Sequence, residues 1–216
     1  YGMTENCCVC TNLDPFQPLG VGSVGKVSSP SVDIKITDEG EVCMTGPFLM
    51  DSYFKNEEMT KETLKDGWLH TGDMGYIDEN GFLYITGRVK DIFKTSKGKY
   101  IEPSVLESYF GKITDFQQMC IVGLGLDQPI LLAVPSEKAK TNKEDFNKKM
   151  SNYLSEVNKD LDGYKKIKKI VMVKEEWLPE NGLSTPTLKI KRAKIDQRFS
   201  ENYQEWYNST EEVLWE

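Results

Sequence analysis

The stretch YIDENGFLYITGRVKD, residues 76–91, contains a predicted strand pair and the predicted boundary between two domains. Two short apolar runs flank DENG at 78–81, a sequence with the composition of a tight turn, so the stretch predicts a β-hairpin. The second strand ends in GRVKD at 87–91, where the apolar pattern gives way to charged residues. We therefore expect one domain over residues 1–89 and a second over residues 90–216.

Strand patterns also dominate the sequence before this hairpin. Val32, Ile34 and Ile36 alternate with polar residues, and another apolar run follows a turn at 38–40. A short helix is expected at 60–64, ending before Gly67. Residues 1–89 are therefore predicted to form β-rich, distorted barrel-like strands.

After the hairpin the sequence alternates between helix and strand patterns. Pro103 suits the first turn of a helix that ends at Gly111. TNKE at 141–144 has the form of a capping box before a second helix, and a closing helix runs through Tyr203. Strands are expected at 119–122, 130–134 and 170–173. The prediction is an α+β fold with a short, mainly antiparallel sheet flanked by helices.

Composition excludes several classes of protein. The 216 residues carry 27 basic and 34 acidic side chains, a net charge of −7, which argues against a general nucleic-acid binder. The longest apolar run, 130–134, is far shorter than the ~20 residues of a membrane-spanning helix. Five cysteines with a single histidine do not have the spacing of a structural zinc site, so we interpret them as small apolar side chains in a reducing compartment.

Several polar residues could carry chemistry. Asp73 follows a glycine, where its two carboxylate oxygens could hold a ribose diol or bond to the backbone of its own turn. Arg88 could bind a hydroxyl or a phosphate, or be solvated. The sequence TSKGK at 95–99 suits phosphate contact but lacks the spacing of a nucleotide-binding loop. Lys189 and Lys191 share one face if their segment is extended, and a solvated basic strand is the alternative. Lys165, Lys166, Lys168 and Lys169 form a basic cluster that could meet a CoA phosphate or an anionic membrane surface, but we favour a solvated surface.

Four segments occur in an order that resembles the adenylate-forming enzymes, which include acyl-CoA synthetases, peptide-synthetase adenylation domains and firefly luciferase. They are YGMTE at 1–5, GWLHTGD at 67–73, GRVKD at 87–91 and PTLKIKR at 186–192. KDIFKTSKGKYI at 90–101 is most similar to the long-chain fatty-acid–CoA ligases. The resemblance implies the end of a large AMP-binding domain followed by a small mobile domain.

The resemblance implies a role for each matching residue in nucleotide binding. Tyr1 would stack on adenine, Thr4 would hydrogen-bond a phosphate, and Glu5 would hold Mg²⁺ through oxygen. Asp73 would bind the ribose diol, with Arg88 beside it.

In the small domain, the resemblance implies that Lys90 is the pivot and that Lys189 is the catalytic lysine, directed at the carboxylate and the α-phosphate of ATP. Lys97, Gly98 and Lys99 would lie in the loop that turns toward CoA.

The implied reaction is the ATP-dependent activation of a long-chain fatty acid to an acyl-adenylate and then to acyl-CoA. Mg²⁺, ATP and CoA are the expected cofactors and substrates, with no nucleic-acid partner and a cytoplasmic location; peripheral membrane contact is left open. Alternatives are another acid–CoA ligase, a peptide-synthetase adenylation domain, or a module that binds CoA or a partner without catalysis.

Two features depart from the family pattern. Leu188 stands where the usual lysine motif has glycine, so the alignment could move to Lys191, although Lys189 fits the flanking residues better. The family's Ser/Thr/Gly-rich phosphate loop should precede Tyr1. We therefore expect a piece of a longer enzyme that depends on an upstream domain and is inactive alone.

Overall fold

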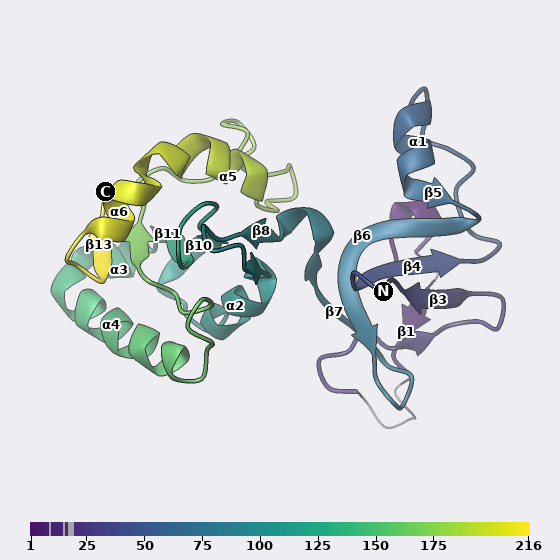
Figure 1. The fold of residues 1–216 in the computed structure, drawn as a ribbon, viewed down its shortest axis with the longest axis horizontal. Coiled ribbons are helices and arrows are strands. Elements are labelled where there is room, and N and C mark those ends of the chain that lie inside the picture. Colours follow the sequence, from purple (N-terminus) through teal and green to yellow (C-terminus); the bar gives the residue numbers. More distant parts are fainter. Residues whose placement is uncertain (9, 15, 17–19) are drawn as a thin grey trace. The chain divides into compact units, whose positions relative to one another are not determined.

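The computed structural model describes residues 1–8, 10–14, 16 and 20–216. The chain forms two compact units, Tyr1–Lys90 and Asp91–Glu216 (Figure 1). This division lies one residue from the boundary expected after residue 89. The mixture of helices and sheets confirms the α+β class. Within the described part of the chain, none of the helices has the length and apolar character needed to cross a bilayer.

The first unit is built on a curled antiparallel sheet whose centre is the long strand β6 (Figure 1). The sheet comprises β3 (Asp33–Ile36), β4 (Glu41–Thr45), β5 (Leu64–Lys65), β6 (Trp68–Ile77) and β7 (Leu83–Arg88). Strand β6 pairs with β4 along one edge, while β5 and β7 pair with opposite ends of β6. The remaining elements are η1 (Thr4–Asn6), β1 (Thr11–Asn12), β2 (Lys26–Val27) and α1 (Glu57–Thr63).

Alternating side chains explain why this sheet folds as it does. Val42, Met44, Leu69 and Leu83 are buried together in its core, which confirms both predicted hairpins. Helix α1 begins earlier than predicted, because the Asn56 side chain accepts a hydrogen bond from the third residue of the helix and caps it.

The second unit contains a four-stranded sheet, a short hairpin and most of the helices. The sheet order is β10 (Phe116–Val122), β11 (Ile130–Pro135), β12 (Ile170–Met172) and β13 (Val213–Trp215). The hairpin pairs β8 (Phe93–Lys94) with β9 (Tyr100–Ile101). The helices are α2 (Pro103–Phe110), α3 (Glu137–Thr141), α4 (Lys143–Lys159), α5 (Arg192–Phe199) and α6 (Tyr203–Asn208), with 3₁₀ turns η2 (Val89–Asp91) and η3 (Ser200–Asn202).

The expectation of a mainly antiparallel sheet is wrong for this unit. Within its four-stranded sheet β10 and β11 are antiparallel, whereas β11–β12 and β12–β13 are parallel. The physical reason is the connection: α3 and α4 separate β11 from β12, and α5 and α6 separate β12 from β13. Helical crossovers return the chain to the same end of the sheet, so the next strand runs parallel.

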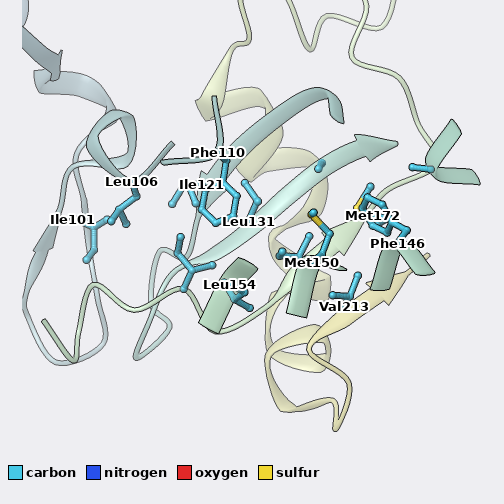
Figure 2. Packing of buried hydrophobic residues seen from close by; sticks show 14 of the residues in the cluster. Ile101, Leu106, Phe110, Ile121, Leu131, Phe146, Met150, Leu154, Met172 and Val213 are labelled. Carbon is cyan, nitrogen blue, oxygen red and sulfur yellow. The ribbon is translucent and has the colours of Figure 1, made fainter. Parts of the chain in front are cut away.

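Helices cover both faces of this sheet. On one face Ile121, Leu131 and Met172 are buried with residues of α2 and α4 (Figure 2). The other face is buried with α5, α6 and Trp177. Every residue of β11 is therefore buried, which explains its continuous apolar sequence. Helix α4 begins at Lys143 with Asn142 as its cap, one residue after the threonine of the predicted capping box.

Lys169 corrects the interpretation of the 165–169 lysines as a solvated surface. Its residue is only 4% exposed, and its ammonium group donates to the backbone carbonyls of Ser209 at 2.7 Å and Glu211 at 2.5 Å. These carbonyls follow the C-terminus of α6, where a cation also meets the negative end of the helix dipole. Burial lowers the pKa of Lys169, so these bonds offset a cost of desolvation.

Replacing Lys169 by methionine is expected to lower the free energy of unfolding by about 1–3 kcal/mol, because two partly buried backbone carbonyls lose their charged donor. The matched control is Lys168→Met at the exposed neighbour, expected to change stability by no more than about 0.5 kcal/mol. Urea unfolding followed by tryptophan fluorescence measures both. Equal stabilities of the two variants would contradict the role assigned to Lys169.

Candidate functional site

A nearly buried carboxylate, Asp73, is the centre of the candidate site in the first unit. The residue is 7% exposed. The Tyr1 hydroxyl donates to Asp73 Oδ2 at 2.5 Å, and Arg88 Nε lies 3.0 Å from Oδ1. Tyr1 and Arg88 therefore converge on the carboxylate of Asp73. The sequence analysis singled out these three residues from three separate motifs.

Strand β6 positions Asp73, and the expectation of a turn at this residue is wrong. Gly72 has φ of 71°, a left-handed conformation suited to glycine, and the strand continues through it. The Thr71 hydroxyl accepts from the Asp73 amide at 3.0 Å and donates to the Val42 carbonyl at 2.7 Å. Asp73 is thus fixed within a paired strand directly opposite Arg88.

The partners of Asp73 differ in their chemistry. Burial, and then the hydrogen bond to Asp73, raise the pKa of Tyr1 above its usual value, so its hydroxyl remains a neutral donor near pH 7. The Arg88 side chain is 59% exposed. Because guanidinium carries several N–H groups, Arg88 can pair with Asp73 and still donate to a ligand.

Glu5 lies at a neighbouring cavity of about 540 Å³ in the same unit. It sits in η1, and its Oε1 accepts from the Tyr53 hydroxyl at 2.8 Å. The cavity is lined by Met3, Glu5, Glu41, Tyr53, Met59, Glu62, Thr63, Lys65, His70, Thr71, Gly72, Arg88 and Lys90. Thr4, beside Glu5, is exposed. The sequence analysis missed Tyr53, because no local pattern connects residues 48 positions apart.

In the second unit, Lys97, Gly98 and Lys99 occupy the turn between β8 and β9 and are exposed. Gly98 adopts φ of 76°, which the turn requires. Lys97 Nζ lies 2.8 Å from Asp127 Oδ2, and hydrogen bonding to this partner raises the pKa of Lys97. Lys97 is therefore a paired cation.

The loop that carries Lys189 is a closed turn, not the extended strand considered above. The Thr185 amide donates to the Lys189 carbonyl at 2.8 Å, and the Lys189 amide donates to the Thr185 hydroxyl at 3.0 Å. Ser184 and Ile190 form a β-bridge behind this turn. The Lys189 side chain is exposed, so its backbone is held while its ammonium group remains accessible.

Arg192 anchors the end of this loop. Its side chain is 10% exposed and lies 2.8 Å from Glu107 and 3.5 Å from Asp91, which follows Lys90 in η2. It also donates to the Ile121 carbonyl at 2.5 Å. One buried cation therefore joins the start of α5 to α2, β10 and the residue after Lys90.

Comparison with known proteins identifies the family. Residues 90–211 match the family model described as the AMP-binding enzyme C-terminal domain. The chain belongs to the AMP-binding enzymes. It is therefore a member of the adenylate-forming superfamily that its motifs resemble.

Curated relatives of this chain are much longer. It is 32% identical to the peroxisomal long chain acyl-CoA synthetase 7 of Arabidopsis thaliana, over 96% of this chain and 34% of the relative. It is 33% identical to long-chain-fatty-acid–CoA ligase 5 of Rattus norvegicus, over 98% of this chain and 35% of the relative. The chain thus spans about a third of the length of these relatives.

Solved structures agree on the fold. The o-succinylbenzoate CoA synthetase of Bacillus subtilis, in complex with its acyl-adenylate intermediate, is 28% identical with a TM-score of 0.71, over 90% of this chain and 40% of that one. The adenylation domain of a carboxylate reductase from Mycobacterium chelonae has a TM-score of 0.75 at 21% identity, over 86% of this chain and 32% of that one.

Leu188 gives a test of the loop that carries Lys189. Its φ of 60° is left-handed, which costs a non-glycine residue about 1–2 kcal/mol, and its side chain is 62% exposed. Leu188→Gly is expected to raise the free energy of unfolding by up to about 1 kcal/mol. This gain is the backbone strain that glycine relieves, minus the cost of the extra conformational entropy that glycine gives the unfolded chain. Leu188→Ala keeps the strain and is the control. Chemical denaturation showing the glycine variant to be the less stable one would contradict this.

Arg192 gives a test of the anchor. Arg192→Met leaves Glu107 largely buried without its cation, so we expect a loss of about 3 kcal/mol in the free energy of unfolding. Arg198→Met is the matched control, because Arg198 pairs with Glu175 at the surface and its loss should cost at most about 1 kcal/mol. Denaturant unfolding measures the difference, and equal losses would show that Arg192 is no anchor.

Proposed function

We propose that this chain supplies the C-terminal part of an ATP-dependent acid–CoA ligase that acts on long-chain fatty acids. The observation that carries the proposal is the convergence of Tyr1 and Arg88 on the Asp73 carboxylate. The names of the curated relatives support fatty acids as the substrate class. Because the chain spans a third of those relatives, the activity is proposed for the longer protein that contains it.

The Asp73 carboxylate is suited to hold the ribose of ATP. Tyr1 and Arg88 each contact one of its oxygens, and every carboxylate oxygen has a further lone pair that can accept from a ribose hydroxyl. The bond to Asp73 positions the Tyr1 ring, whose face would stack on adenine. Arg88 would donate to the same ribose. Thr4, exposed at the start of η1, would bind a phosphate through its hydroxyl.

Glu5 is suited to hold the Mg²⁺ that accompanies ATP. The Tyr53 hydroxyl donates to one carboxylate oxygen of Glu5, Oε1. Glu5 also lines the cavity that Arg88 lines. Mg²⁺ prefers oxygen ligands and would neutralise charge on the phosphates.

Lys189 would stabilise the first chemical step. A carboxylate oxygen of the fatty acid attacks the α-phosphorus of ATP, and the bond to pyrophosphate breaks. The Lys189 turn holds its backbone, and its exposed ammonium group would face the charge that grows at the α-phosphate. In the second step the sulfur of CoA attacks the acyl carbon and AMP leaves.

Lys90 would be the pivot that exchanges these steps, bringing Lys97, Gly98 and Lys99 toward CoA. Lys90 is exposed, whereas Asp91 beside it is paired with Arg192. The ion pair between Lys97 and Asp127 has a consequence: Lys97 can bind a CoA phosphate only by leaving or sharing Asp127.

The test is fatty-acid-dependent exchange of pyrophosphate into ATP by the full-length protein. Lys189→Gln is expected to lower the exchange rate by about 10²–10³, the typical cost of one preorganised charge donor. Lys191→Gln is the matched control and should retain most of the rate. The reverse pattern would move the catalytic role to Lys191, the alternative alignment.

Two further measurements separate the alternatives. Exchange supported by amino acids but no fatty acid would replace the proposal with an adenylation domain of a peptide synthetase. The 216-residue chain alone is expected to show no exchange, because it corresponds to 34% of the relative from Arabidopsis thaliana. Calorimetric binding of CoA by this chain, with no exchange by the full-length protein, would favour a binding module.

A further inference from the structure

Glu41, Cys43 and His70 form a second cluster of reactive side chains in the first unit, outside the residues assigned above. Glu41 and Cys43 lie two residues apart on β4, and His70 on β6 is the residue directly opposite Cys43 in the strand register. All three residues lie within paired strands, so the central sheet fixes the backbone that carries them. Sites built on paired strands hold their side chains more closely than sites on loops.

The distances suit a metal ion. Glu41 Oε2 lies 2.7 Å and Cys43 Sγ 3.4 Å from His70 Nδ1, and the three ligand atoms lie within 4.8 Å of one another. Ligands of tetrahedral zinc, at about 2.0–2.3 Å from the ion, are separated from each other by roughly 3.3–3.6 Å. The Nδ1–Sγ separation lies within this range, whereas the Oε2–Nδ1 separation is shorter, so the Glu41 carboxylate would have to rotate away from His70 to admit the ion.

The surroundings prepare Glu41 for this role. Its second carboxylate oxygen, Oε1, accepts from the Gly72 amide at 2.9 Å, which leaves Oε2 directed at His70. Hydrogen bonds of this kind orient ligating carboxylates in metal sites. Lys35 pairs with Cys43 on β3, but its ammonium group lies over the Trp68 ring at 4.2 Å.

The cluster has an access route. Glu41 and His70 both line the 540 Å³ cavity, while Cys43 is fully buried behind them. A cation entering from the cavity would meet the carboxylate and the imidazole first and then the sulfur. Its fourth position would face the cavity and take water.

We propose that Glu41, Cys43 and His70 bind a borderline divalent cation such as Zn²⁺, with one coordination position open to the cavity. Thiolate and imidazole favour Zn²⁺ or Co²⁺ over Mg²⁺, so this site is chemically distinct from the one expected at Glu5. On binding, the metal–sulfur bond replaces the thiol S–H bond, and that proton leaves to solvent. The proton shared by His70 Nδ1 and Glu41 Oε2 is also displaced, moving to His70 Nε2 or to solvent, because Nδ1 must be unprotonated to bind the metal. The proposal does not depend on the ligase function.

The test is a Co²⁺ titration of the 216-residue chain, followed by thiolate-to-cobalt charge-transfer absorption. Cys7 and Cys8 are exposed and adjacent, so they could bind Co²⁺ themselves. The titration is therefore made in a Cys7→Ser/Cys8→Ser background, where we expect one equivalent of Co²⁺ to produce the band and Zn²⁺ to remove it.

Adding Cys43→Ser to this background is expected to abolish the band. His70→Gln, at a partly exposed position, is expected to weaken Co²⁺ binding by more than about 100-fold, beyond the usual cost of losing an outer-shell partner. Circular dichroism of each variant checks that it folds. A band that disappears with Cys7 and Cys8, or that is unchanged in folded His70→Gln, would overturn the proposal and leave an ordinary Glu41–His70 ion pair.

Discussion

A buried carboxylate must be paired, and at Asp73 this requirement organises the first unit. Removing the charge of Asp73 from water is unfavourable unless hydrogen bonds and a cation replace its hydration. The chain meets the requirement with Tyr1 from the first residue and Arg88 from the end of β7. The pairing therefore fixes the start of the chain against β6, and the same two groups that satisfy the carboxylate are those suited to a nucleoside.

The second unit uses a buried cation in a comparable way. Arg192 is held by Glu107 and Asp91. Two of the segments that meet in this way carry an exposed lysine: Lys90 precedes Asp91, and Lys189 lies three residues before Arg192. Ion pairs in the interior thus hold the backbone beside exposed cations at the surface. This arrangement suits a cation that must reach a substrate without carrying its loop with it.

Local patterns predicted the elements well, but contacts between distant segments escaped them. The hairpin at 76–85 and the helix from Pro103 have turn and cap signals within a few residues, so the sequence was sufficient. The parallel pairing of β12 had no local signal, because strand direction depends on the crossovers. The sequence around Lys169 predicts a surface lysine, because the Ser209 carbonyl that accepts from its ammonium group lies 40 residues later in the chain. Tyr1, Asp73 and Arg88 were found because a family resemblance connects segments that periodicity cannot.

Gly72 links the two chemical clusters of the first unit. Its amide donates to Glu41, and it immediately precedes Asp73 in β6. Burial alternates along this strand, with Thr71 and Asp73 buried and His70 partly exposed, because neighbouring side chains point to opposite faces of the sheet. Gly72 holds a left-handed conformation between them, so one hydrogen-bonded amide connects the Glu41 carboxylate to the backbone that carries Asp73.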